Sequence, residues 1–165
     1  MSSCRVLIID DSAVSRRALS DILSTDPDIE VVGTAPDAMI GLRKIEAFSP
    51  DVLTLDVEMP GMDGLTFLER LMKSNPMPVV MVSAYTEAGS DAAIRSLELG
   101  AVDVVEKPRY EVREGLSNLS ELIIDKVKGA ALAQVASPSM RFFEQTREES
   151  TVISVTQERL GHAPL

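Results

Sequence analysis

Acidic, hydroxyl and ammonium side chains stand at the ends of short apolar runs in this chain. Asp10 and Asp11 follow residues 6–9, Asp56 follows residues 52–55, Ser83 follows residues 79–82, and Lys107 follows the valine-rich run 102–106. Such β-branched runs are typical of strands buried on both faces of a parallel sheet, and ligands bind at the carboxyl edge of such sheets. Side chains from four strand ends are therefore predicted to form one site.

The chemistry of these side chains points to a cation and a phosphoryl group. Three carboxylates at one sheet edge repel one another, which favours capture of a hard divalent cation such as Mg²⁺, with Mn²⁺ as the alternative. Phosphoryl transfer onto a carboxylate needs little beyond in-line positioning and charge neutralisation. Asp56 is then the nucleophile, and Asp10 and Asp11 hold the cation. Ser83 donates to one phosphoryl oxygen and Lys107 neutralises another.

Taken singly, each of these residues also has a structural explanation. An acidic pair after a strand is commonly a turn or a helix cap. The corresponding alternatives are a loop acid for Asp56, a turn hydroxyl for Ser83 and a surface lysine for Lys107. Only the conjunction of all five residues favours the functional interpretation.

The elements that must position these residues alternate along the chain. Strands are predicted near residues 5–9, 29–33, 52–55, 78–82 and 101–105, and helices near 13–24, 36–47, 64–73, 88–98 and 111–134. This alternation predicts right-handed crossovers and an α/β fold with a parallel sheet. Helical spacing places one set of apolar side chains of the first helix on its buried face: Val14, Ala18, Leu19, Ile22 and Leu23. Asp63 is predicted to cap the third helix, and Gly64 to permit its tight entry.

Length and charge limit the function classes. The 165 residues suit one well-buried domain, predicted at 1–136, and an irregular linker or tail at 137–165. A net charge of -10 argues against nucleic-acid binding, which needs clustered Lys and Arg. A single cysteine, no signal peptide and no apolar stretch of about 20 residues predict a cytoplasmic protein without a membrane anchor.

Motifs of other enzyme classes are missing from the sequence. It contains neither Gly-x-Gly-x-x-Gly nor a Gly-Lys-Ser/Thr loop, the patterns that cradle phosphates. It also lacks Gly-x-Ser-x-Gly, and its one histidine is His162, near the end. A serine-hydrolase activity of the chain itself is therefore not expected.

Together, these residues resemble the receiver domain of bacterial two-component response regulators, over about residues 4–130. The resemblance is carried by Asp10-Asp11, by Leu55-Asp56 with the segment 59–64, by Val82-Ser83-Ala84 and by Glu106-Lys107-Pro108. It implies a flavodoxin-like, doubly wound sheet of order 2-1-3-4-5 with five helices. It also implies that Asp56 is the phosphoacceptor and that the backbone carbonyl of Glu58 joins the Mg²⁺ ligands. The Glu58 side chain either adds negative charge at the mouth of the site or is simply solvated.

The segments 51–60, 77–83, 97–103 and 105–109 look like the receiver half of the chemotaxis protein-glutamate methylesterase. In that family a chemotaxis-type histidine kinase phosphorylates the receiver, which relieves inhibition of a C-terminal catalytic domain. The resemblance implies a monomer that serves as a switch, with no esterase activity because that domain is absent here. One departure from many receivers is Val104, at a position where an aromatic switch residue often stands. Tyr85 is the nearest aromatic residue that could serve as the switch instead.

Three other interpretations remain open at this stage. A stand-alone, single-domain response regulator would control a separate partner protein. A phosphatase of the haloacid dehalogenase type also uses an aspartate beside Mg²⁺, but its Asp-x-Asp pattern differs from the Asp-Asp-Ser found at residues 10–12. A pseudo-receiver would act only as a protein-binding scaffold, although every expected functional group is present.

Overall fold

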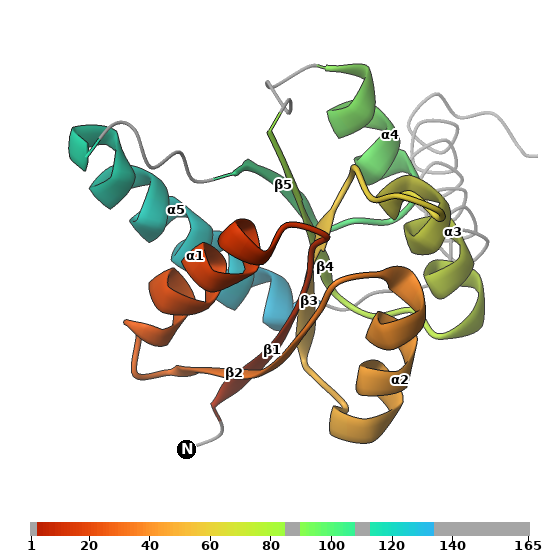
Figure 1. The fold of residues 1–165 in the computed structure, drawn as a ribbon, viewed down its shortest axis with the longest axis horizontal. Helices are drawn as coiled ribbons and strands as arrows, with labels where there is room; N and C mark the ends of the chain where they lie inside the picture. The colour runs from red at the N-terminus through yellow and green to blue at the C-terminus, as the bar shows by residue number, and fades with distance from the viewer. Residues whose placement is uncertain (1–2, 85–89, 108–112, 134–165) are drawn as a thin grey trace, which may run out of the picture.

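The computed structural model describes residues 3–84, 90–107 and 113–133, and these form a parallel five-stranded sheet between two layers of helices (Figure 1). The strands are β1 (Cys4–Ile9), β2 (Ile29–Ala35), β3 (Val52–Asp56), β4 (Val79–Ser83) and β5 (Asp103–Glu106), in the order β2-β1-β3-β4-β5. This order confirms the one implied by the receiver resemblance. The predicted tail at 137–165 and Tyr85 lie outside the described residues.

The helices are α1 (Ala13–Ser24), α2 (Ala38–Phe48), α3 (Gly64–Ser74), α4 (Asp91–Glu98) and α5 (Arg113–Ala131). Helices α1 and α5 cover one face of the sheet, and α2, α3 and α4 lie on the other (Figure 1). Alternate strand residues serve the two layers, since Val6 and Ile8 pack in the core under α1 and α5 whereas Leu7 and Ile9 pack in the core under α2 and α3. Helices cover both faces of the sheet, which explains why the strand sequences are continuous apolar runs.

Side-chain caps set where the chain leaves each strand end and enters the next helix. Ser12, Asp37, Asp63 and Ser90 each accept a hydrogen bond from a backbone N–H three residues later. The cap at Asp37 starts α2 at Ala38, two residues later than predicted, and the predicted cap at Asp63 is confirmed.

The predicted buried face of α1 is correct for three of its five residues, and Ile22 is only partly buried. Ala18, Leu19 and Leu23 are buried, whereas Val14 is 64% exposed. The prediction for Val14 was wrong because the buried side chains of α1 begin only at Ala18, one turn further along the helix. Helical spacing identifies the apolar stripe but not how far along the helix the sheet extends.

Gly64 brings the start of α3 against the end of β3. Its N–H donates to the carbonyl of Val57 at 2.8 Å, and a Cβ atom added to it would lie 1.9 Å from the carbonyl oxygen of Asp56. No side-chain movement can relieve this contact, because the opposing atom belongs to the backbone. The predicted tight entry at Gly64 is therefore confirmed, and the close approach fixes the loop that carries residues 57–63.

Substituting Gly64 with Ala is expected to destabilise the fold by about 3 kcal/mol, because the backbone of β3 and α3 must separate. Urea unfolding followed by circular dichroism measures the change. Gly129→Ala is the matched control, since a Cβ atom there meets nothing within 4 Å. In the interior of α5 this control should raise stability by up to about 1 kcal/mol. Equal stability of Gly64→Ala and the wild type would contradict the packing described.

Candidate functional site

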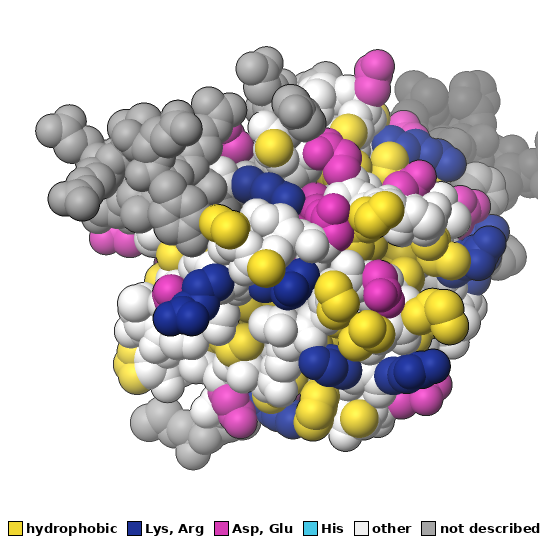
Figure 2. Space-filling model, in the orientation of Figure 1, with side chains coloured by type: hydrophobic (Ala, Val, Ile, Leu, Met, Phe, Trp, Pro, Cys, Tyr) yellow, Lys and Arg dark blue, Asp and Glu magenta, His cyan; other side chains and the backbone are white. Residues whose placement is uncertain are grey.

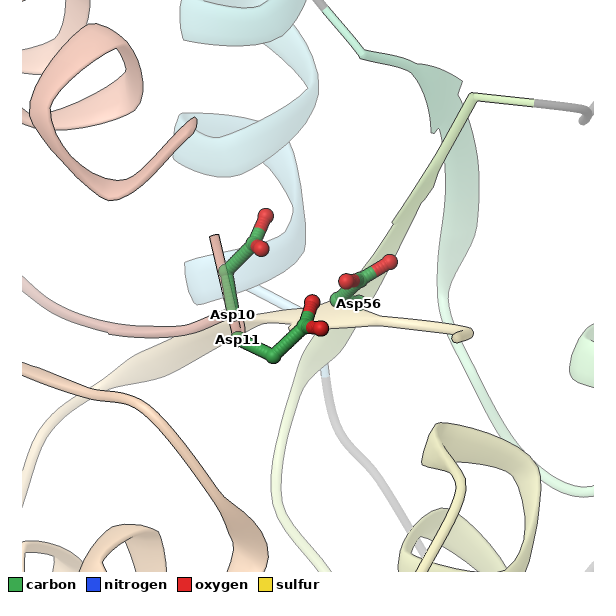
Figure 3. Close-up of side chains that lie close together, drawn as sticks. All are labelled: Asp10, Asp11 and Asp56. Carbon is green, nitrogen blue, oxygen red and sulfur yellow. The ribbon is translucent and has the colours of Figure 1, made fainter. Parts of the chain in front are cut away.

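The three predicted acids converge at the carboxyl edge of the sheet. Asp10 and Asp11 directly follow β1, and Asp56 is the last residue of β3, the neighbouring strand, where Ile9 pairs with Leu55. One carboxylate oxygen from each acid lies within 4.8 Å of the others. Figure 3 shows the Asp11 side chain turned toward Asp56. Acidic side chains also gather near the middle of the molecular face in Figure 2, where Figure 1 places the ends of these strands.

Asp10 and Asp56 are both 1% exposed, whereas Asp11 is exposed to solvent. Asp10 forms the turn considered for it and also lies within the acidic cluster. Its Oδ1 accepts a hydrogen bond from the N–H of Ser12 at 2.8 Å, as in a turn leading into α1. Its Oδ2 is buried and accepts no hydrogen bond from the described residues. Oδ1 also accepts a hydrogen bond from Lys107 Nζ at 3.3 Å, so this oxygen both shapes the turn and contacts the lysine of the site.

Lys107 supplies the positive charge between the two buried acids. Its Nζ lies 3.0 Å from Asp56 Oδ2 and 3.2 Å from Asp10 Oδ2. It follows β5 directly, and its backbone N–H donates to the carbonyl of Ser83 at 2.9 Å, which fixes the start of its side chain. The structure thus places Lys107 against the acids and not on the open surface, with its side chain only 16% exposed.

Ser83 and Glu58 meet beside Asp56. The Ser83 hydroxyl donates to Glu58 Oε1 at 3.1 Å, and the backbone N–H of Glu58 donates to Asp56 Oδ1 at 3.2 Å. Ser83 is 1% exposed although its partner Glu58 reaches solvent. Neither sequence-based alternative for the Glu58 side chain included this contact. The only sequence signal for it is an acid two residues after the central aspartate.

The surroundings change how readily Asp56 ionises. Burial, and after it the negative charge of Asp10, raise the pKa of Asp56 from 3.8 to about 7, although the Lys107 ammonium opposes this change. Burial alone would lower the pKa of Lys107, but its hydrogen bond to Asp56 and the charge of Asp10 outweigh burial and raise it. Without a further cation, the two buried carboxylates therefore compete for one lysine.

These donors suit a hard divalent cation. All three clustered side chains offer oxygen, the ligand atom that Mg²⁺ prefers. The buried Asp10 Oδ2 accepts no hydrogen bond from the described residues and has only its ion pair with Lys107 at 3.2 Å, so it can still serve as a ligand. Asp11, on the exposed side, leaves room for retained waters. An open depression of about 500 Å³, lined in part by Asp11, Glu58 and Asp63, adjoins this side of the cluster.

Comparison with known proteins places this arrangement in a family. The sequence model of the response regulator receiver domain family matches residues 6–117 of the chain. The chain belongs to the response regulator receiver domain family. Its relatives include the protein-glutamate methylesterase/protein-glutamine glutaminase 2 of Bordetella avium, 52% identical over 139 residues, and a protein of the same enzyme name from Methylobacillus flagellatus, 56% identical over 131 residues.

These matches cover 84% and 79% of this receiver chain but only 40% and 37% of the two relatives, so the chain spans about two fifths of their length. Among solved structures, the response regulator domain of Thermotoga maritima CheB is similar with a TM-score of 0.72 at 37% identity. That likeness covers 80% of this chain and 98% of the Thermotoga domain. The chain is therefore a receiver domain of the CheB type. None of its described helices combines the length and the apolarity needed to cross a lipid bilayer.

The raised pKa of Asp56 predicts how stability depends on pH when no divalent cation is present. Between pH 4 and pH 7 the native receiver binds more protons than the unfolded chain, so the free energy of unfolding falls as pH rises and levels off above pH 7. Asp56→Asn removes this loss and should be about 4 kcal/mol more stable than the wild type at pH 8, since the pKa of Asp56 differs by about three units between the native and unfolded chains. The difference should vanish near pH 4.

Urea unfolding in EDTA at several pH values measures this difference, with Asp21→Asn on the exposed surface of α1 as the control. The control should follow the wild type at every pH. A wild-type receiver that is as stable at pH 8 as Asp56→Asn would show that the Asp56 charge is fully compensated in the native state.

Proposed function

We propose that this receiver is a phosphorylation switch in which Asp56 accepts a phosphoryl group from a chemotaxis-type histidine kinase. The observation that carries the proposal is the position of Asp56, buried at a strand end beside both the Lys107 ammonium and the acid pair Asp10 and Asp11. A carboxylate so placed can attack phosphorus while the charge that develops on the phosphoryl oxygens is neutralised from the side.

In the proposed reaction, an Asp56 carboxylate oxygen forms a bond to phosphorus as the bond from phosphorus to the histidine nitrogen breaks. The nitrogen keeps the electron pair, and the product is an aspartyl phosphate. Mg²⁺ or Mn²⁺, held by Asp10, Asp11, Asp56 and the backbone carbonyl of Glu58, would shield the charge of the transferring group. Lys107 binds one phosphoryl oxygen, and the Ser83 hydroxyl donates to another.

Two comparisons support the proposed chemistry and its context. The relatives in Bordetella and Methylobacillus carry the name of protein-glutamate methylesterases. A structural relative with a TM-score of 0.64 at 26% identity is described as a CheX-CheY complex with BeF₃ and Mg²⁺ from Borrelia burgdorferi. We therefore propose that this receiver, in a longer protein, controls a methylesterase catalytic domain, and that the cognate kinase is of the chemotaxis type.

A small phosphodonor such as acetyl phosphate, with Mg²⁺, is expected to add one phosphoryl group to the wild-type chain. The product should be stable in acid and labile in base, and Asp56→Asn should abolish it because the nucleophile is lost. Intact-protein mass spectrometry, with and without EDTA, measures the modification. Asp21→Asn is the matched control and should label normally. Equal labelling of Asp56→Asn, or labelling that persists in EDTA, would refute the assignment.

A further inference from the structure

Glu58 contacts two groups of the proposed phosphorylation site through different atoms. Its backbone N–H donates to Asp56 Oδ1 at 3.2 Å, and its carboxylate accepts the Ser83 hydroxyl at 3.1 Å. The first contact fixes the position of residue 58 relative to the acceptor carboxylate. The second contact therefore joins the Ser83 hydroxyl to the side chain of a residue whose backbone is hydrogen-bonded to Asp56.

The contact with Ser83 links a buried group to an exposed one. Ser83 is 1% exposed, and its backbone carbonyl accepts the Lys107 N–H, so the backbone that carries the hydroxyl is held in place. Glu58 reaches solvent, where water can satisfy its carboxylate if the hydroxyl leaves. A hydroxyl has a single O–H, so Ser83 cannot donate to Glu58 and to a phosphoryl oxygen at the same time.

We propose that Glu58 is a positioning residue that holds the Ser83 hydroxyl in the unphosphorylated receiver and so slows phosphoryl transfer to Asp56. This inference rests on the proposed function. As the phosphoryl group arrives, the hydrogen bond from Ser83 to Glu58 breaks and one from Ser83 to a phosphoryl oxygen forms, with no proton transferred. The Glu58 carboxylate returns to water. In the unphosphorylated receiver, the negative charge of the Glu58 carboxylate strengthens the hydrogen bond from Ser83, because hydrogen bonds to ionised acceptors are stronger than those to neutral ones.

A competing explanation is that Glu58 acts only by its negative charge, which repels a negatively charged phosphoryl group wherever Ser83 points. The two explanations differ in one respect. An effect carried by the hydrogen bond needs the Ser83 hydroxyl, whereas repulsion by charge does not. A double-mutant cycle on Glu58 and Ser83 therefore separates them.

The cycle compares the wild type, Glu58→Ala, Ser83→Ala and the double variant at saturating Mg²⁺, with acetyl phosphate as the donor. We expect Glu58→Ala to raise the phosphorylation rate about threefold to tenfold in the wild-type background. In the Ser83→Ala background the same substitution should leave the rate unchanged. Glu58→Gln, which keeps an acceptor without the charge, should fall between the wild type and Glu58→Ala. Glu69→Ala, an exposed acid on α3, is the control and should change nothing.

Beryllofluoride with Mg²⁺ gives a second measurement that needs no turnover, since it imitates the bound phosphoryl group. Its affinity, followed by ¹⁹F NMR, should rise in Glu58→Ala only when Ser83 is present. An equal gain in both backgrounds, or no gain in either, would overturn the inference. A wild-type receiver that neither labels at Asp56 nor binds beryllofluoride would instead refute the proposed function, so the two failures are distinguishable.

Discussion

The constraint on which this structure depends is that helices cover both faces of the sheet. Strands buried on both sides hold few polar side chains along their length, with Thr54 of β3 as an exception, so the charged side chains of the central strands stand at or near the strand ends. Asp10, Asp56, Ser83 and Lys107 all stand at or directly beyond such ends. The apolar core that stabilises the fold therefore brings four functional groups together at the carboxyl edge of the sheet, although they come from segments far apart in the sequence.

Bringing these groups together places two negative charges in a buried site. Asp10 and Asp56 are fully buried side by side, and a buried carboxylate is tolerated only when a partner compensates for the lost water. Lys107 is that partner for both, which explains why its backbone is held to β4 and its side chain is directed inward. Because one ammonium serves two carboxylates, the site retains a need for positive charge, and this need is the physical basis of its proposed chemistry.

The strands, the helices and the residues at the strand ends could be predicted because each depends on local sequence: apolar runs, helical periodicity and capping side chains. The strand order was implied by the receiver resemblance and not by the residues, since alternation alone is compatible with other doubly wound orders. Val14 was misplaced because periodicity does not reveal how far a helix extends over the sheet. The contact between Ser83 and Glu58 joins two elements, and no spacing along the chain predicts which rotamers bring them together.

The shared lysine also sets the formal charge that the cluster carries when its three acids are ionised. Three ionised carboxylates and one ammonium carry a formal charge of -2, which a single divalent cation brings to neutrality. A monovalent ion would leave the site negative and a second divalent ion would make it positive. Under the proposed function, one divalent cation would therefore match the charge of the ionised cluster, whereas one potassium ion would leave a negative charge uncompensated.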